Sequence, residues 1–128
     1  MAHQAEFDDV ARLIREFGPR ATVVTVTESL RPHTVTAMIG IDGDRLVTEV
    51  GSRTRSNAID RPGMTVVWNP VGDGEYQLIL DCTAEHVGEP DERDVSTLRM
   101  AVVGGILHRL AGLPDGPPTC RSLADATQ

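Results

Sequence analysis

From residue 21 onwards the chain consists of short runs rich in valine, threonine and isoleucine, separated by turn residues. The runs cover residues 21–27, 33–41, 45–50, 64–68, 76–87, 94–100 and 105–110. β-branched residues favour extended backbone, and Asp42-Gly43 between two runs is typical of a tight hairpin. In the run 76–87, Leu78, Leu80 and Cys82 alternate with the residues of the opposite face, which indicates one buried face. These patterns predict an antiparallel sheet.

Helical patterns occur at only two places. In residues 4–17 the apolar positions recur at threes and fours, and Gly18-Pro19 ends the pattern. Residues 51–61 lose the period of two and are expected to hold one or two helical turns. The 128 residues are enough for one compact domain. We expect a mainly β domain with short helices over residues 1–112, a six-stranded antiparallel barrel, and a flexible C-terminal tail over residues 113–128.

Composition narrows the classes of function. A net charge of -7 disfavours nucleic acid as a partner. No apolar run approaches the roughly 20 residues that span a bilayer, so we expect a cytoplasmic protein without membrane contact. Cys82, Cys120 and the scattered histidines lack the spacing of metal ligands, so no metal site and two free thiols are expected. All 12 basic side chains are arginines, so an anion site must use guanidinium groups, hydroxyls or backbone amides.

Residues 51–57 concentrate the groups that such a site needs, between the end of a strand and a short helix. The side chains concerned are those of Ser52, Arg53, Thr54, Arg55 and Asn57. Guanidinium groups and hydroxyls beside the free amides of a helix start are suited to a terminal phosphate. An ordinary solvated loop has the same composition, so this segment alone leaves both interpretations open.

Residues 50–68 resemble a stretch of the pyridoxamine 5'-phosphate oxidase-like proteins. In that family a strand ends in Gly-Ser-Arg-Lys, passes through a short helix to Asn-Pro, and enters the next strand. The run 76–85 is similar to the strand that follows there, which starts with a glutamine and ends in Ala-Glu. The resemblance covers residues 7–87. It implies the FMN-binding split barrel, a homodimer with two flavin clefts at the subunit interface, and a small-molecule substrate.

The resemblance also implies roles for particular residues. Arg53 matches the arginine that holds the cofactor phosphate, Gln77 matches a glutamine that contacts the flavin, and Thr48 falls near the cofactor-facing end of a strand. The family's next residue after the arginine is usually lysine, whereas this chain has Thr54, which supplies no charge, and Arg55 one step further on. No catalytic residue is assigned.

The function implied is a flavin- or deazaflavin-dependent oxidoreductase that transfers a hydride to or from an unidentified small molecule. FMN is the expected cofactor, and the deazaflavin coenzyme F-420 is the alternative. The oxidase's substrate-binding C-terminus is not matched, and His108 is interpreted as structural. The alternative function is a non-enzymatic split-barrel dimer that carries a cofactor or has lost flavin binding, which Thr54 favours. One histidine ligating haem iron also stays open.

Overall fold

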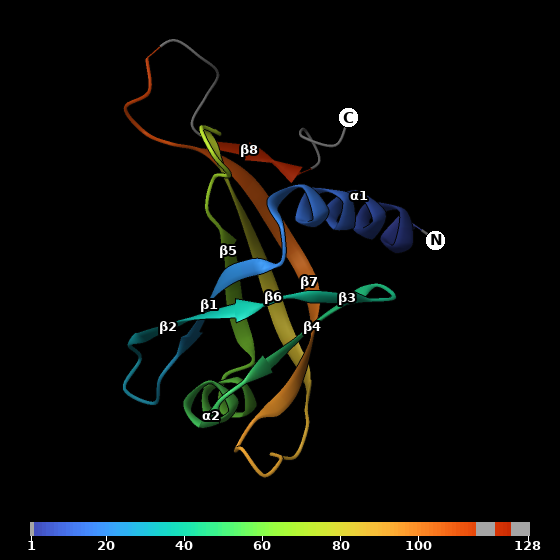
Figure 1. The fold of residues 1–128 in the computed structure, drawn as a ribbon, viewed down its shortest axis with the longest axis vertical. Coiled ribbons are helices and arrows are strands. Elements are labelled where there is room, and N and C mark those ends of the chain that lie inside the picture. Colours follow the sequence, from blue (N-terminus) through green and yellow to red (C-terminus); the bar gives the residue numbers. More distant parts are fainter. Residues whose placement is uncertain (1, 115–119, 124–128) are drawn as a thin grey trace.

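The computed structural model describes residues 2–114 and 120–123, which form two helices and one antiparallel sheet (Figure 1). The elements are α1 (Ala2–Phe17), β1 (Arg20–Val26), β2 (Pro32–Met38), β3 (Gly40–Asp42), β4 (Arg45–Val50), α2 (Ser52–Asp60), β5 (Gly63–Trp68), β6 (Tyr76–Val87), β7 (Ser96–Arg109) and β8 (Cys120–Ser122). Seven strands follow the order β2-β1-β5-β6-β7-β4-β3, and β8 pairs with β7. The prediction of a mainly β antiparallel fold is confirmed.

The expected count of six strands is wrong, because the described residues form eight. The run 33–41 divides at Ile39, whose N–H donates to the carbonyl of Pro19 at 2.7 Å, so that the chain changes partner there. The runs 94–100 and 105–110 are joined in the single strand β7. Register shifts against β6 let β7 continue through Gly104 and Gly105, which lie between the two runs.

A short part of the expected tail pairs with the sheet. Cys120–Ser122 pairs with β7, with Ser122 opposite Ile106. Gly105 makes room for this segment, because a Cβ atom there would lie 2.7 Å from the side chain of Leu123. Three residues of the expected tail thus pair with the sheet, and residues 115–119 and 124–128 lie outside the described part of the chain.

The core lies between α1 and one face of the sheet. Phe7, Val10, Leu13 and Ile14 form the buried face of α1, as the spacing of three and four predicted. They share one apolar cluster with strand side chains that are fully buried, namely Val23, Leu46, Val66, Leu78, Leu80, Leu98 and Met100. Figure 1 shows α1 and α2 well apart along the long axis of the molecule, so α2 is separate from this helix.

The curled sheet leaves a seam between its two halves. β2 is an edge strand that pairs only with β1, and β4 belongs to the other half. The Thr48 hydroxyl donates to the carbonyl of Met38 at 2.8 Å and so holds β4 against the end of β2. Backbone groups on the free side of an edge strand stay available for other partners. At the seam, β2 and β4 are therefore held together, and backbone groups on the outer side of β2 are available for a ligand.

Trp68 anchors the junction between α1 and β1. Its indole N–H donates to the carbonyl of Gly18 at 2.8 Å, and its ring is buried. Trp68→Phe should lower the free energy of unfolding by about 1–3 kcal/mol, because the carbonyl loses its donor and the core loses volume. Urea denaturation followed by circular dichroism measures this, with the exposed Val71→Ala as the control. An unchanged unfolding midpoint would show that this contact does not stabilise the fold.

Cys82 is predicted to be chemically inert in the folded protein. Burial, and then the charge of Asp81, raises the pKa of its thiol from 9.0 to about 12. Because the thiolate is the reactive form, a disulfide reagent should label Cys82 in a Cys120→Ser variant only as fast as the protein unfolds. The raised pKa stabilises the fold below about pH 9, and this contribution declines as the pH rises towards 12. Rapid stoichiometric labelling of the folded variant would contradict this placement.

Candidate functional site

α2 follows β4 after the single residue Gly51, and helical hydrogen bonds are present at both of its ends. The Arg55 N–H donates to the carbonyl of Gly51 at 3.0 Å, and the Arg61 N–H donates to the carbonyl of Asn57 at 2.8 Å. The predicted helical turns in this segment are therefore present. On the inner face of α2, the buried Asn57 side chain donates to the hydroxyl of Thr25 at 3.1 Å. This bond ties the helix to β1.

The structure divides the residues of the predicted phosphate cradle into two groups. Thr54 is buried on the inner face of α2 and lines neither of the cavities described below. Arg55 extends to the start of β7, where its guanidinium donates to the Asp94 carboxylate at 2.5 Å and to the Ser96 hydroxyl at 3.1 Å. Arg55 is thus held in an ion pair on the sheet side of the helix, and these two residues anchor α2.

The turn that carries Asp94 is itself ordered by Asp91. The Asp91 carboxylate accepts the N–H groups of Arg93 at 2.8 Å and of Val95 at 3.0 Å. Hydrogen bonding, first from Val95 and then from the Arg93 side chain, holds the pKa of Asp91 below its ordinary value. The bond to Asp91 in turn raises the pKa of Arg93. The partner of Arg55 therefore sits on a well-defined turn.

A cavity of about 530 Å³, here called the α2 cavity, lies between the exposed side of α2 and the β1–β2 turn. Its lining consists of Thr27, Glu28, Ser29, Arg31, Pro32, His33, Ser52, Arg53, Ser56, Asn57, Asp60 and Arg61. Three of the predicted site residues, Ser52, Arg53 and Asn57, meet here. Sequence reasoning missed Arg31 and Arg61, because nothing in the local pattern shows that the hairpin folds back on the helix.

The α2 cavity is lined by cationic groups that carry no ion pair. Within residues 2–114 and 120–123, neither Arg31 nor Arg53 has a carboxylate partner. Arg61 donates through Nε to the carbonyl of Val26 at 2.8 Å. The Nδ1 atom of His33 is buried without a hydrogen-bond partner in that same part of the chain. Unpaired donors beside a cavity suit an anionic ligand.

A second cavity of about 750 Å³, here called the seam cavity, lies where β2 approaches β4. Its lining consists of Arg20, Thr36, Ala37, Met38, Gly40, Val47, Thr48, Glu49 and Thr97. Thr48, a predicted site residue, lines this cavity rather than the α2 cavity. His33 and Met38 contribute to the two cavities from one strand, about 17 Å apart at the rise of a β-strand. The two cavities therefore follow the same edge strand.

Gln77 lies away from both cavities. It occupies the face of β6 opposite the buried Leu78, as the alternation predicted, and its amide donates to Asn69 at 3.3 Å. Its neighbour on β7 is His108, whereas α2 leads into the other end of β6, where Gly63 pairs with Thr83. About 20 Å of strand separates Gln77 from that end. One chain does not bring Gln77 to Arg53.

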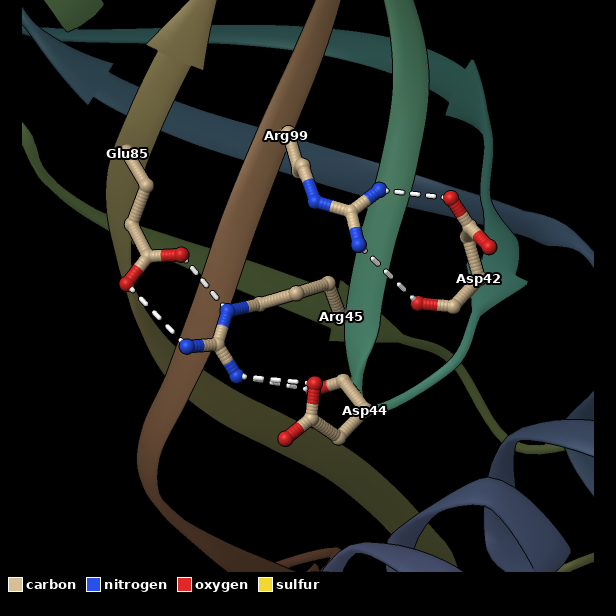
Figure 2. Close-up of polar contacts among 5 residues, drawn as sticks. All are labelled: Asp42, Asp44, Arg45, Glu85 and Arg99. Atoms are coloured by element: carbon tan, nitrogen blue, oxygen red, sulfur yellow. Dashed lines mark hydrogen bonds and ion pairs between the residues drawn. The ribbon is translucent and has the colours of Figure 1, made fainter.

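A network of ion pairs fastens the β3–β4 hairpin to β6 and β7 (Figure 2). Arg45 binds Glu85 at 2.6 Å and Asp44 at 3.1 Å, and Arg99 binds Asp42 at 2.6 Å. The hydrogen bond to Glu85 is the largest cause that raises the pKa of Arg45. None of the five residues lines either cavity. The network belongs to the scaffold that carries the seam.

The described residues contain neither a metal-ligand cluster nor a helix suited to a membrane. No group of three or more His, Cys, Asp and Glu side chains in residues 2–114 and 120–123 is arranged to hold a metal ion. Neither helix in that part of the chain is both long and apolar enough to cross a bilayer.

Known proteins resemble this chain in sequence and in structure. No protein-family model matches it. Uncharacterized protein Mb0449c of Mycobacterium bovis and Uncharacterized protein MT0457 of Mycobacterium tuberculosis are each 32% identical over 113 residues, covering 80% of this chain and 79% of theirs.

Three solved structures illustrate the fold. An F420 reductase has a TM-score of 0.62 at 12% identity, over 69% of this chain and 90% of its own. A pyridoxamine 5'-phosphate oxidase-related, FMN binding protein from Nostoc punctiforme has a TM-score of 0.64 at 10% identity, over 82% and 84%. HutZ, the heme storage protein from Vibrio cholerae, has a TM-score of 0.60 at 15% identity, over 77% and 92%. The chain thus belongs to one family with the two mycobacterial proteins, and its fold is the split barrel of the pyridoxamine 5'-phosphate oxidase-like proteins that its sequence resembles.

Proposed function

We propose that this protein is a flavin- or deazaflavin-dependent oxidoreductase that transfers a hydride to or from a small molecule. The observation that carries the proposal is the pairing of two cavities along β2, one lined by unpaired guanidinium groups and one at the seam of the sheet. An elongated cofactor with an anionic group at one end and a planar ring at the other suits this pairing. A bound flavin supplies the hydride chemistry, so the chain has to bind the cofactor, orient the substrate and exclude water.

The α2 cavity is the proposed site of the anionic end. Arg53 and Ser52 lie in the first turn of α2, where backbone N–H groups have no partner within the helix. A guanidinium, a hydroxyl and these amides together favour a phosphate at this place. Thr54 does not line the cavity, so its lack of charge does not weaken the proposed site. Thr54 is therefore weaker support for the alternative in which flavin binding has been lost.

The seam cavity is the proposed site of the ring. β2 presents backbone groups on its unpaired side, and Thr36, Met38 and Val47 add a mixed lining of hydroxyl and apolar surface. Backbone amides in fixed positions are suited to the carbonyl groups of a flavin-like ring, where negative charge develops on reduction. Arg20 and Glu49 also line this cavity and are the charged groups nearest the proposed ring.

We further propose that the protein acts as a homodimer. Val67, Ile79 and Ile106 stand side by side on the outer face of β5, β6 and β7, and each is partly exposed. A row of apolar side chains across three strands fits a second copy of the same sheet. Gln77 lies on this outer face beside Ile79. Gln77 of a second copy, rather than of the same chain, is then the one proposed to meet a cofactor bound at Arg53.

FMN remains the first cofactor proposed and coenzyme F-420 the second. The structural neighbours include an FMN binding protein, an F420 reductase and a heme storage protein, so FMN, coenzyme F-420 and haem should each be titrated. The arginines that line the α2 cavity favour a cofactor with a phosphate group.

Arg53→Ala tests the anionic end of the site. The variant should lose bound FMN, with a dissociation constant raised about 10- to 100-fold, because a charge-assisted hydrogen bond is removed. Visible absorbance of the purified protein and titration of the apo-protein measure this, and circular dichroism checks the fold. The control is Arg15→Ala, which removes the same charge from the exposed side of α1. Equal affinity of the two variants would remove Arg53 from the site.

Ile79→Asp tests the proposed dimer. A carboxylate in the apolar row should convert the dimer to a monomer in sedimentation velocity, and bound cofactor should be lost with it. Val71→Asp, which places the same charge on an exposed loop residue, is the control and should stay dimeric. A monomeric wild-type protein, or an Ile79→Asp variant that remains dimeric, would exclude this face as the interface.

A further inference from the structure

The α2 cavity contains a second cationic group that no sequence pattern assigns to it. Arg31 lies in the turn between β1 and β2, and the turn places it across the cavity from the first turn of α2. Of the arginines near α2, Arg55 is paired with Asp94, and Arg61 uses its Nε atom on the carbonyl of Val26. Arg31 has no ion pair among the residues that the structure describes.

Hydrogen bonds fix the backbone of the β1–β2 turn and so define the position of Arg31. The N–H of Thr27 donates to the carbonyl of Arg31 at 2.9 Å, and the N–H of Arg31 donates to the Thr27 hydroxyl at 3.1 Å. Leu30 takes a left-handed conformation with a φ of 64°, and its side chain is exposed. A non-glycine residue in this conformation is strained, and such strain is often found beside functional groups.

The lining of the α2 cavity contains acidic as well as basic side chains. Glu28 lies in the same turn as Arg31, and Asp60 lies at the end of α2, and both carboxylates line the cavity. An anion in the cavity is therefore attracted by Arg31, Arg53 and Arg61 and repelled by Glu28 and Asp60. His33, two residues after Arg31, also lines the cavity, and its buried Nδ1 has no hydrogen-bond partner in residues 2–114 and 120–123.

We propose that Arg31 supplies, opposite Arg53, a positive charge from the β1–β2 turn, and that this charge makes the site selective for a phosphate monoester. This inference rests on the proposed function, because it names the residue that distinguishes a phosphorylated cofactor from the same ring without phosphate. A phosphate monoester carries terminal oxygens on several sides, so it accepts hydrogen bonds from α2 and from the β1–β2 turn together. The selectivity of the cavity is then set by charge on the turn.

The test compares FMN with riboflavin, which share the ring and differ by the phosphate. Arg31→Gln should raise the dissociation constant for FMN about 10- to 100-fold and leave that for riboflavin unchanged. Glu28→Gln removes a repelling charge from the same turn and should tighten FMN binding about two- to fivefold, again without an effect on riboflavin. Arg15→Gln is the charge-matched control on α1. Circular dichroism confirms that each variant is folded.

A second arm uses inorganic phosphate and does not depend on the flavin. Phosphate should raise the melting temperature of the wild-type protein, and Arg31→Gln should remove that shift. An unchanged ratio of FMN to riboflavin affinity in Arg31→Gln would overturn the inference while the proposed function stands. If the wild-type protein binds no flavin, but phosphate raises its melting temperature and this rise requires Arg31, the proposed function is refuted and the anion site is retained. A phosphate shift that Arg31→Gln leaves intact would overturn the role of Arg31.

Discussion

The buried hydrogen bond between Asn57 and Thr25 holds α2 on the sheet, and the proposed site depends on that placement. The pair Arg55–Asp94 fixes the same helix from the side of β7. With both contacts in place, Thr54 and Asn57 face inward and Arg53 faces the β1–β2 turn. A helix free to rotate about its axis would present a different set of side chains to the cavity. The scaffold thus determines which of the two neighbouring arginines is available to a ligand.

Charge explains why the α2 cavity stands out in an acidic protein. With a net charge of -7, carboxylates are in excess, and Arg12, Arg45, Arg55, Arg93, Arg99 and Arg109 all have carboxylate partners. Arg15, Arg20, Arg31, Arg53 and Arg61 have none among the described residues, and three of these, Arg31, Arg53 and Arg61, line the α2 cavity. This concentration of unpaired guanidinium groups is the basis of the proposed anion site.

The sequence predicted the larger features of the fold because they are local. Alternation in residues 76–87 and the spacing in residues 4–17 each report on one element, and both elements form as expected. The count of strands was wrong because it depends on tertiary contacts. The bond from Ile39 to Pro19 divides one run, and the packing of Leu123 on Gly105 adds a strand from the expected tail. Neither contact can be recognised from the spacing of apolar and turn residues in the sequence.

The candidate site was predicted only in part for the same reason. Arg53 and Ser52 were found because the helix start carries its own signal, whereas Arg31 is brought to the cavity by a hairpin that spacing does not reveal. Arg55 looked equivalent to Arg53 in the sequence, and only the turn at Asp94 shows that its guanidinium is engaged elsewhere.

The most direct measurement of the central claim is a crystal structure of the protein grown with FMN. We expect a phosphate within hydrogen-bond distance of the Arg53 guanidinium in the α2 cavity, with the ring lying along the free edge of β2 towards Thr48. A phosphate bound elsewhere, or Arg53 turned to solvent beside a well-ordered cofactor, would contradict it.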